Sequence, residues 1–429
     1  MTNKTWQIGV FNYGLNGGGA EQVAATLVSL WQTSGHSVVL FAEEEINNNS
    51  DFTVSDHTEC VVLPKERSAR LLAWKQAVVK YEFEVLVHHQ YSAKSLASDT
   101  ELLSKLGVKT IVVVHDPFCS ERYGFDPWNN SLFNGPTYIN IDALVCLSPV
   151  EALWWGLMLK RPAYYIPNPL TTAVGNENDH VNNSGKVILW IGRFIERKRL
   201  EDALQAFALI SKIHADVSLI ILGSSGQVSI DRQYHKLAHK LGVGNRVKFM
   251  GKQKDVSFYF RRATLHLITS ASESFGLTIA ESKMHGVPVV MYDLPNLSLT
   301  KDQRGILTAE WGNVRDLADK LSYILANSEY CKKLGEEGQL SLEEFSDDKI
   351  LNQWNIIFDR VIGGHRLGVE LNGYQTNDNY RALVIEMMRS WNFFMKRNYW
   401  KFKVFKKIEQ HVPIEWLKRL IRNRWPDVF

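Results

Sequence analysis

The sequence predicts an α/β protein built from two doubly wound, parallel-sheet domains. Strand-like and helical segments alternate along two separate stretches, as is typical of parallel sheets covered by helices on both faces. A polar, turn-rich segment from Asn168 to Gly185 separates these stretches. The chain has 429 residues, 45% of them hydrophobic and 22% charged, which is enough for two globular cores.

The first domain is expected over residues 1–168. After its first strand come a glycine-rich turn and a helix with apolar residues at positions 23, 24, 27, 28 and 30 or 31. A short apolar run from Ala163 to Pro167 ends the domain. The strands before this run, including the first, are expected near residues 6–11, 37–42, 60–63, 84–88, 109–114 and 142–147.

A linker is expected at residues 169–185, followed by the second domain at 186–346. Leu200 to Ile210 predicts an amphipathic helix, because its apolar residues recur at positions 200, 203, 204, 207 and 210. The strands are expected near residues 187–191, 217–222, 246–250, 265–269, 288–292 and 305–308.

The last segment, residues 381–429, differs in charge from the rest. It carries 12 Lys and Arg against 4 Asp and Glu, a net charge of +8, whereas residues 1–380 carry 37 against 42, a net charge of −5. Ten of its residues are Trp, Tyr or Phe. Such a helical, basic and aromatic tail suits an anionic membrane surface. It carries no recognised nucleic-acid motif, so no nucleic-acid partner is expected.

Cysteine usage and hydropathy favour a cytoplasmic protein. The four cysteines, at positions 60, 119, 146 and 331, are widely spaced, which argues against a disulfide framework or a zinc site. The N-terminus lacks the basic-then-apolar pattern of a signal peptide. Because no run of about 18 apolar residues occurs, no transmembrane helix is expected.

Residues 272–290, SESFGLTIAESKMHGVPVV, place two carboxylates eight residues apart. A buried strand is expected before them and a helix from Gly276 to His285. Glu273 therefore lies in the predicted turn and Glu281 on the predicted helix. The pair also fits two solvated acids near a helix start.

The start of this helix offers unpaired backbone N–H groups and a positive dipole end. Both features suit a phosphate or a diphosphate, which the two acids could flank. The residues that supply these groups are Phe275, Gly276, Leu277 and Thr278.

Two cations flank a second strand-to-helix turn, in VILWIGRFIERKRLEDALQAFALI. Arg193 and Lys198 could neutralise a departing diphosphate, the guanidinium through a fork of donors and the ammonium as a point charge. Charged residues in such loops are also commonly solvated.

Strand ends in the first stretch carry glycines and histidines. Gly17, Gly18 and Gly19 let the backbone approach a ligand closely, but they do not form the G-x-G-x-x-G dinucleotide fingerprint. His115 follows the strand TIVVV, at the end where open α/β sheets bind ligands, although a histidine there also serves as a hydrogen-bonded strand cap. His88 and His89 follow another strand and could shape an acceptor site.

These motifs together resemble retaining glycosyltransferases of the GT-B fold, particularly family 4. The 272–290 stretch is similar to the family's EGFGLxxxEAMAxGxPVV, with Ser274 in place of Gly, and residues 192–199 are similar to GRLxxxKG, with Arg199 in place of Gly. GGGAEQ resembles the family's GGAE loop. The resemblance covers residues 6–362 and implies two Rossmann-like domains facing a cleft. Residues 347–380 would then be a return helix and linker.

The resemblance also implies roles for individual residues. In the family the first Glu, here Glu273, contacts donor-sugar hydroxyls, and the second, Glu281, contacts the ribose hydroxyls. His115 would contact the donor sugar. The glycine-rich loop would place Gly18 and Gly19 near the donor diphosphate and the acceptor, and Glu21 near the acceptor pocket.

The sequence therefore predicts a retaining glycosyltransferase that uses a nucleotide-diphosphate sugar, with Arg193, Lys198, Glu273 and His115 as its catalytic residues. We expect a saccharide or lipid-linked acceptor in bacterial envelope or exopolysaccharide synthesis, with the enzyme peripheral on the inner face of the cell membrane. No D-x-D motif is present, so no metal or other cofactor is expected. A nucleotide-sugar epimerase of the same fold and a catalytically silent partner subunit are the alternatives.

Overall fold

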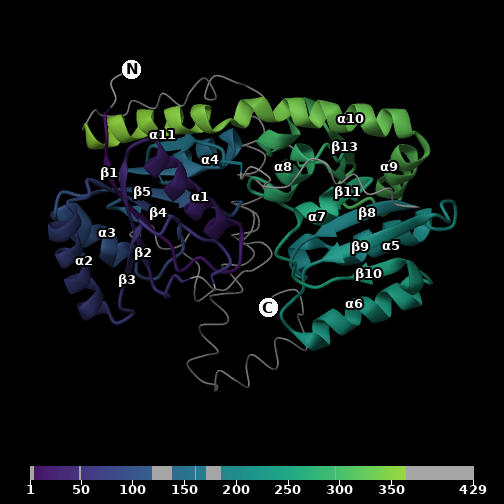
Figure 1. The fold of residues 1–429 in the computed structure, drawn as a ribbon, viewed down its shortest axis with the longest axis horizontal. Helices are drawn as coiled ribbons and strands as arrows, with labels where there is room; N and C mark the ends of the chain where they lie inside the picture. Colours follow the sequence, from purple (N-terminus) through teal and green to yellow (C-terminus); the bar gives the residue numbers. More distant parts are fainter. Residues whose placement is uncertain are drawn as a thin grey trace. The chain divides into compact units, whose positions relative to one another are not determined.

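The computed structural model describes residues 4–47, 50–117, 138–159, 161–170, 185–294 and 296–363. The predicted tail, residues 381–429, and most of the predicted linker lie outside this part of the chain. Two compact units make up the chain (Figure 1). Unit 1 comprises Met1–Ile166 together with Gln353–Phe429, and unit 2 comprises Pro167–Asn352.

Unit 1 contains a seven-stranded parallel sheet in the order β3-β2-β1-β4-β5-β6-β7. The chain winds outward from β1 in one direction and then from β4 in the other, so the winding reverses between these two central strands. The predicted first set of strands is therefore confirmed. The strands are Gln7–Phe11 (β1), Ser37–Ala42 (β2), Glu59–Val62 (β3), Val85–His88 (β4), Lys109–Val114 (β5), Ala143–Cys146 (β6) and Ala163–Tyr165 (β7).

Helices α2 (Arg67–Tyr81) and α3 (Leu96–Lys105) contribute Trp74, Ala77 and Leu103 to a core with Phe11 and Phe41 of the sheet. A second core joins α4 (Pro149–Leu159) to β5 and β6. Because the central strands are buried, their sequences are nearly continuous apolar runs, as parallel sheets require.

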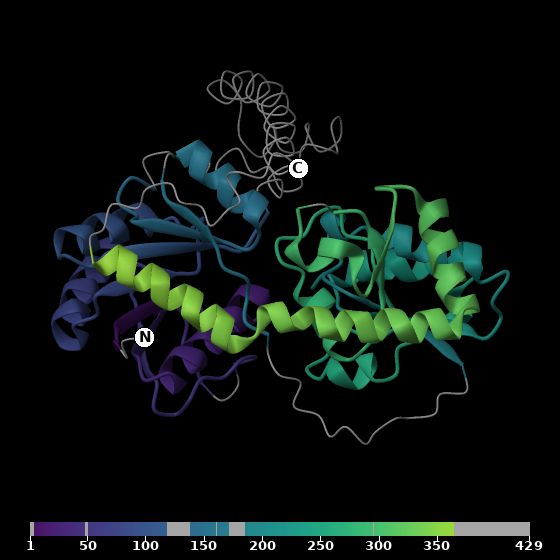
Figure 2. The same ribbon diagram turned by 90° about the horizontal axis from the view of Figure 1, so that it is seen from above.

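Helix α11 (Asp347–Ile362) begins in unit 2 and ends in unit 1. In unit 1 it packs on α1 (Gly19–Thr33): the ring of Trp354 meets the ring of Trp31 edge-on, with 5.1 Å between their centroids. His36 Nε2 lies 3.0 Å from Asn355 Oδ1. Figure 2 shows this last stretch of α11 in yellow-green. These contacts make the predicted return helix part of the unit 1 core.

Unit 2 contains a six-stranded parallel sheet in the order β10-β9-β8-β11-β12-β13. Here the winding reverses between β8 and β11. The second predicted set of strands is also confirmed, and with it the doubly wound α/β fold class. The strands are Lys186–Ile191 (β8), Val217–Leu222 (β9), Val247–Phe249 (β10), Leu265–Ile268 (β11), Val289–Tyr292 (β12) and Ile306–Ala309 (β13).

One face of the unit 2 sheet carries its largest core, where α5 (Leu200–Ile210), α6 (Val228–Lys240) and α9 (Val314–Ala326) pack on the strands. The predicted helix at 200–210 is α5, and every apolar position predicted for its inner face is buried. A smaller core places Phe260 of α7 (Ser257–Phe260) against Leu189 and Leu222. The remaining helices are α8 (Leu277–Met284) and α10 (Ser328–Leu340).

Candidate active site

The reversal of winding between β8 and β11 positions the loops of the candidate site in unit 2. In open α/β sheets, ligands bind beyond the carboxyl ends of the strands at such a reversal. The loop after β8 leads into a 3-10 turn, η4 (Glu196–Lys198), and the loop after β11 leads into α8. The two strongest sequence motifs thus lie on adjacent strands.

Lys198 and Glu273 form a direct ion pair, with 2.5 Å between Nζ and Oε1. Their side chains are 16% and 11% exposed, so the pair is largely shielded from water. Burial alone would raise the pKa of the Glu273 carboxyl, but the charges of Lys198 and Arg197 outweigh it and hold that pKa below its usual range. Glu273 is therefore ionised at neutral pH.

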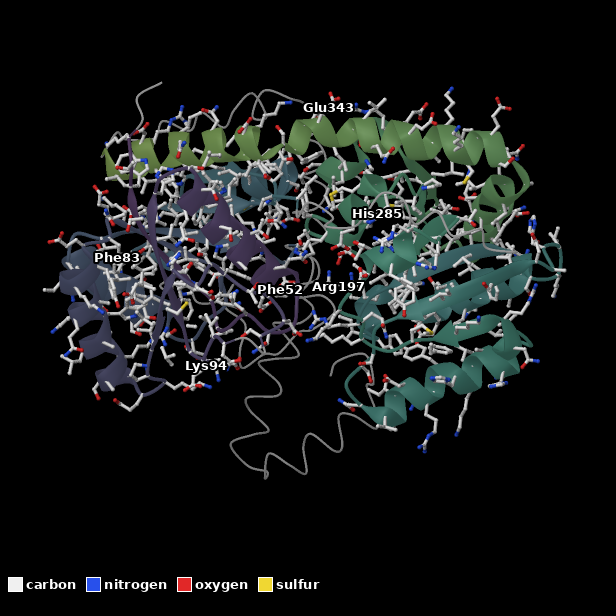
Figure 3. All side chains as sticks on the ribbon, viewed as in Figure 1. Phe52, Phe83, Lys94, Arg197, His285 and Glu343 are labelled. Carbon is white, nitrogen blue, oxygen red and sulfur yellow. The ribbon has the colours of Figure 1, made fainter. Side chains whose placement is uncertain are left out.

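Arg197 is a residue of this site that the sequence analysis missed. Its Nη1 donates to Ser272 O at 3.0 Å and lies 3.9 Å from Glu273 Oε2. Figure 3 labels Arg197 in unit 2. The run ERKR showed neighbouring cations, but only the 3-10 turn determines which of them face Glu273.

Arg193, which was predicted to neutralise a diphosphate together with Lys198, has an exposed side chain. Among the described residues it forms no ion pair within 4 Å, so the structure does not bring it to Glu273. An exposed guanidinium after a strand end remains available to a ligand.

Backbone and side-chain hydrogen bonds join the two loops. Trp190 Nε1 donates to Thr269 Oγ1 at 3.0 Å, and that hydroxyl donates to Lys198 O at 2.7 Å. Ala271 N donates to Arg197 O at 2.8 Å. The backbone positions that carry Lys198 and Glu273 are therefore fixed relative to each other.

The start of α8 has the geometry expected from the sequence. Gly276 is its N-cap and adopts a left-handed conformation, φ 82° and ψ 59°, which glycine tolerates best. A Cβ at this position would lie 2.6 Å from Ile279 Cδ1. Leu277 and Thr278 form the first helical positions, where backbone N–H groups have no intrahelical acceptor. Phe275 is buried and packs edge-on against Phe345.

Glu281 lies on α8 and is partly exposed. Because one turn of an α-helix rises 5.4 Å, Glu281 lies about one turn beyond the first helical residue, Leu277. Glu273 precedes the same helix. Both carboxylates thus occupy the predicted places, one in the turn and one on the helix.

Arg199, which occupies the glycine position of the resembled motif, has a positive φ of 47°. Its Nε donates to Asp202 Oδ2 at 2.7 Å, and its guanidinium lies 5.3 Å from the ring centroid of Trp311. The side chain therefore offsets the cost of a left-handed conformation with an ion pair and an aromatic contact.

In unit 1 the reversal of winding lies between β1 and β4, and the glycine-rich loop follows β1. Gly17 has φ 117°, and its N–H donates to Asp51 Oδ2 at 2.8 Å. Glu21 Oε2 accepts from Gly18 N at 3.1 Å. In this structure Glu21 thus stabilises the start of α1, where Gly19 is the first helical residue.

Three histidines lie at the ends of β4 and β5: His88 is the last residue of β4, His89 follows it, and His115 follows β5. His89 Nδ1 lies 2.8 Å from His115 Nε2, and the two rings stack with their centroids 5.1 Å apart. Burial lowers the pKa of His115 to about 4. Burial, followed by the neighbouring His115, also lowers the pKa of His89. Both rings are therefore neutral at pH 7, and one ring nitrogen donates an N–H hydrogen bond to the other.

His88 lies apart from that pair. Its Nδ1 accepts from Gln90 N at 3.2 Å, which assigns the proton to Nε2, and its ring lies 4.5 Å from that of Phe11. Burial, followed by the charge of Arg70, lowers the pKa of His88 to about 3. His88 therefore belongs to the core, whereas His115 is partly exposed.

Among the described residues, no cluster of three or more His, Cys, Asp or Glu side chains could hold a metal ion. Within the same part of the chain, no helix is long and apolar enough to span a membrane.

A lysine, two glutamates and a helix start lie near one reversal of winding in a doubly wound α/β fold, and these groups suit a phosphorylated ligand. Residues 176–341 match the family model described as "Glycosyl transferases group 1". These residues cover most of unit 2 and include Arg193, Lys198, Glu273 and Glu281. The match supports a relationship to that family through unit 2.

Two curated relatives have similar sequences. N-acetyl-alpha-D-glucosaminyl L-malate synthase from Bacillus anthracis is 30% identical over 44% of this chain and 49% of its own length. The lipopolysaccharide core biosynthesis glycosyltransferase LpsE from Rhizobium meliloti is 26% identical over 55% of this chain and 68% of its own length. Both relatives are thus matched over only part of this chain.

A solved structure matches the fold over a longer range. HepE from Anabaena, in complex with UDP and glucose, has a TM-score of 0.67 and 16% sequence identity, over 83% of this chain and 100% of that one. At this identity the likeness shows the fold, which is the GT-B architecture of two Rossmann-like domains.

Proposed function

We propose that this protein is a retaining glycosyltransferase of family 4 that transfers a sugar from a nucleotide-diphosphate sugar to a saccharide or lipid-linked acceptor. The observation that carries the proposal is the Lys198–Glu273 pair, located where the winding of the unit 2 sheet reverses and directly before the start of α8. The cation, the anion and the unpaired N–H groups all belong to unit 2.

The diphosphate is assigned to the start of α8 and to the two cations. Leu277 and Thr278 offer backbone N–H groups, Lys198 offers an ammonium and Arg193 an exposed guanidinium. Charge develops on the diphosphate as the bond to the sugar breaks, so these donors stabilise the transition state more than the ground state. By analogy with single oxyanion donors, each contributes about 3 kcal/mol, roughly a hundredfold in rate.

Glu273 is assigned to the sugar hydroxyls and Glu281 to the ribose hydroxyls. An ionised carboxylate accepts hydrogen bonds only, which suits neighbouring hydroxyl donors. Because Lys198 holds Glu273 in the free protein, donor binding redistributes this ion pair between phosphate and sugar. UDP and glucose in the HepE structure support a donor of this class.

In unit 1, His115 is assigned to the donor sugar, and Gly18, Gly19 and Glu21 to the substrate side of the glycine-rich loop. His115 is neutral, so it exchanges hydrogen bonds with hydroxyls and does not act as a cation. No protein nucleophile is assigned. Metal independence is part of the proposal, since the cations and helix start would balance the diphosphate charge.

The acceptor and the cellular location are inferred from the tail, residues 381–429, which lies outside the described residues, and from one relative. The basic, aromatic tail suits an anionic membrane surface, and LpsE acts in lipopolysaccharide core biosynthesis according to its name. We therefore assign a lipid-linked saccharide acceptor in the bacterial envelope, with the protein peripheral on the cytoplasmic face of the cell membrane.

The test is a panel of nucleotide sugars, each incubated with the purified full-length protein and followed by nucleotide release and proton NMR. One α-linked donor should be hydrolysed or transferred with an α-configured product. A β-configured product would refute retention. Epimerisation of the sugar would favour the epimerase, and binding without turnover of any donor or acceptor would favour the silent subunit.

A further inference from the structure

Three consecutive backbone carbonyls directly before α8 each accept a hydrogen bond from a side chain of a different loop. Trp311 Nε1 donates to Ala271 O at 3.2 Å, Arg197 Nη1 to Ser272 O at 3.0 Å, and Asn296 Nδ2 to Glu273 O at 3.1 Å. We call Arg197, Asn296 and Trp311 the carbonyl clasp.

The clasp supplies the hydrogen-bond donors that backbone N–H groups would supply in a helix or a sheet. Ala271, Ser272 and Glu273 are 7%, 3% and 8% exposed, and they lie between the end of β11 and the start of α8. Buried carbonyls without a partner are costly, so almost all in folded proteins are paired. Here all three acceptors depend on side chains.

The contacts also determine the direction of the Glu273 side chain. Ser272 O belongs to the peptide plane before the Glu273 Cα, and Glu273 O belongs to the plane after it. Arg197 fixes the first plane and Asn296 fixes the second. Since the two planes together set φ and ψ, they set the direction of the Cα–Cβ bond.

We propose that Arg197, Asn296 and Trp311 are positioning residues that hold Glu273 and the first turn of α8 in the geometry needed for sugar transfer. This inference rests on the proposed function. The clasp joins the loop between β11 and α8 to the turn after β8, which also carries Lys198, and to two further segments, one after β12 and one after β13.

Arg197 has a second effect within the clasp. Its Nη1 lies 3.9 Å from Glu273 Oε2, so its charge stays beside the carboxylate when Lys198 turns to a phosphate. Ala271 N donates to Arg197 O at 2.8 Å, so the two loops hold each other in both directions.

Each of the three members of the clasp can be altered with little disturbance. Trp311 is 48% exposed, and its ring lies beside the guanidinium of Arg199. Trp311→Phe keeps an aromatic ring and removes the indole N–H. Asn296→Ala removes one amide, and Arg197→Lys keeps the charge near Glu273 but lacks the guanidinium fork that reaches Ser272 O.

Amide hydrogen exchange of the full-length protein without ligand tests the clasp independently of any reaction. Each of the three variants should exchange the amides of residues 272–278 roughly tenfold faster, the effect of losing about 1.4 kcal/mol of local stability. Tyr323→Phe and Asn245→Ala, which each remove a side-chain donor from an exposed residue of unit 2, are the controls and should leave these amides unchanged. Unchanged exchange in all three clasp variants would overturn the clasp.

Steady-state kinetics with the donor found in the panel tests the positioning role. The clasp variants should lower kcat roughly tenfold and change KM for the donor less than twofold, because misdirected groups lose transition-state contacts first. Faster exchange with unchanged kcat would refute positioning. If no donor is turned over, the proposed function and the positioning role both fail, and the exchange data still decide whether the clasp exists.

Discussion

Two cations of the same motif occupy different environments. Lys198 is largely buried against Glu273, whereas Arg193 is exposed. If both stabilise a departing diphosphate, both contribute to turnover, but only Lys198 contributes strongly to folding. Their substitutions should therefore separate catalysis from stability.

Lys198→Ala and Arg193→Ala should each lower kcat about a hundredfold. Lys198→Ala should also lower the free energy of unfolding by about 2–4 kcal/mol, because it leaves the buried Glu273 carboxylate without its nearest cation. Arg193→Ala should change that free energy by less than about 0.5 kcal/mol. Urea denaturation and steady-state kinetics of both variants provide the measurement. Equal stability losses would contradict the structural distinction between them.

The buried His266 should make the folding stability of unit 2 sensitive to acid. It is fully buried on β11 beside Phe260, and burial, followed by the charge of Lys198, lowers its pKa to about 3. Between pH 6.5 and pH 3 the unfolded chain binds a proton at this site and the folded chain does not. Stability from His266 is therefore complete above pH 6.5 and is lost as the pH falls.

His266→Leu should remove this dependence. In the native protein, His266 contributes a loss of about 2 kcal/mol between pH 6.5 and pH 5, since one proton corresponds to 1.36 kcal/mol per pH unit. Urea unfolding of unit 2 at both pH values should show a smaller decrease for the variant. The same decrease in both proteins would mean that His266 takes up its proton equally in the folded and the unfolded states.

The sequence placed Glu273, Glu281 and Lys198 correctly on their elements, because each follows a strand whose apolar pattern is unambiguous. It could not identify Arg197, Asn296 or Trp311 as neighbours of the Glu273 loop. Asn296 and Trp311 lie 23 and 40 residues beyond the carbonyls they bind, in segments without periodicity. Such contacts depend on tertiary packing, which local spacing does not encode.

At the scale of elements, the start of α8 depends on one glycine. Gly276 needs a left-handed backbone, and a Cβ there would also meet Ile279 at 2.6 Å. Gly312, with φ 77°, has a similar backbone, but a Cβ there would meet no atom of the described residues within 4 Å. The two glycines thus separate backbone strain from steric overlap.

Gly312→Ala should cost about 1–2 kcal/mol of unfolding free energy, the cost of a left-handed alanine. Gly276→Ala should cost more and should weaken nucleotide binding, because the buried Ile279 side chain in the first turn of α8 has to move to make room for the added methyl group. Calorimetry with the nucleotide and urea denaturation of both variants measure the two effects. Equal nucleotide affinity in both variants would argue against a phosphate at this helix start.

Strands and helices were predictable where burial imposes a continuous pattern. The predicted helix at 200–210 coincides with α5, and the strand at 217–222 coincides with β9. By contrast, the 3-10 turn η4, which orients Arg197 and Lys198, has no apolar repeat and was not predicted. Short turns owe their shape to capping and tertiary hydrogen bonds.

At the scale of the molecule, both units have the same construction. In each, the winding reverses beside the first strand, and the loops after the two central strands carry the polar residues of interest. In unit 1 these loops hold Gly18 and His89, and in unit 2 they hold Lys198 and Glu273. In the proposed enzyme, the different loops on this repeated architecture would give each unit its own ligand chemistry.

The segment outside the described residues leads to a prediction for the whole chain. Residues 381–429 carry a net charge of +8, and each basic residue near an anionic surface contributes about 1 kcal/mol to binding. The full-length protein should co-sediment with liposomes that contain anionic lipid and should dissociate as salt rises.

A triple variant in which Gln replaces Lys403, Lys406 and Lys407 should bind these liposomes more weakly. The control is a triple variant in which Gln replaces three lysines of unit 2, Lys240, Lys332 and Lys333, and it should bind as the native protein does. Equal binding by both triple variants, or binding that salt leaves unchanged, would exclude electrostatic docking through this segment, since attraction between the tail and anionic headgroups requires both dependences.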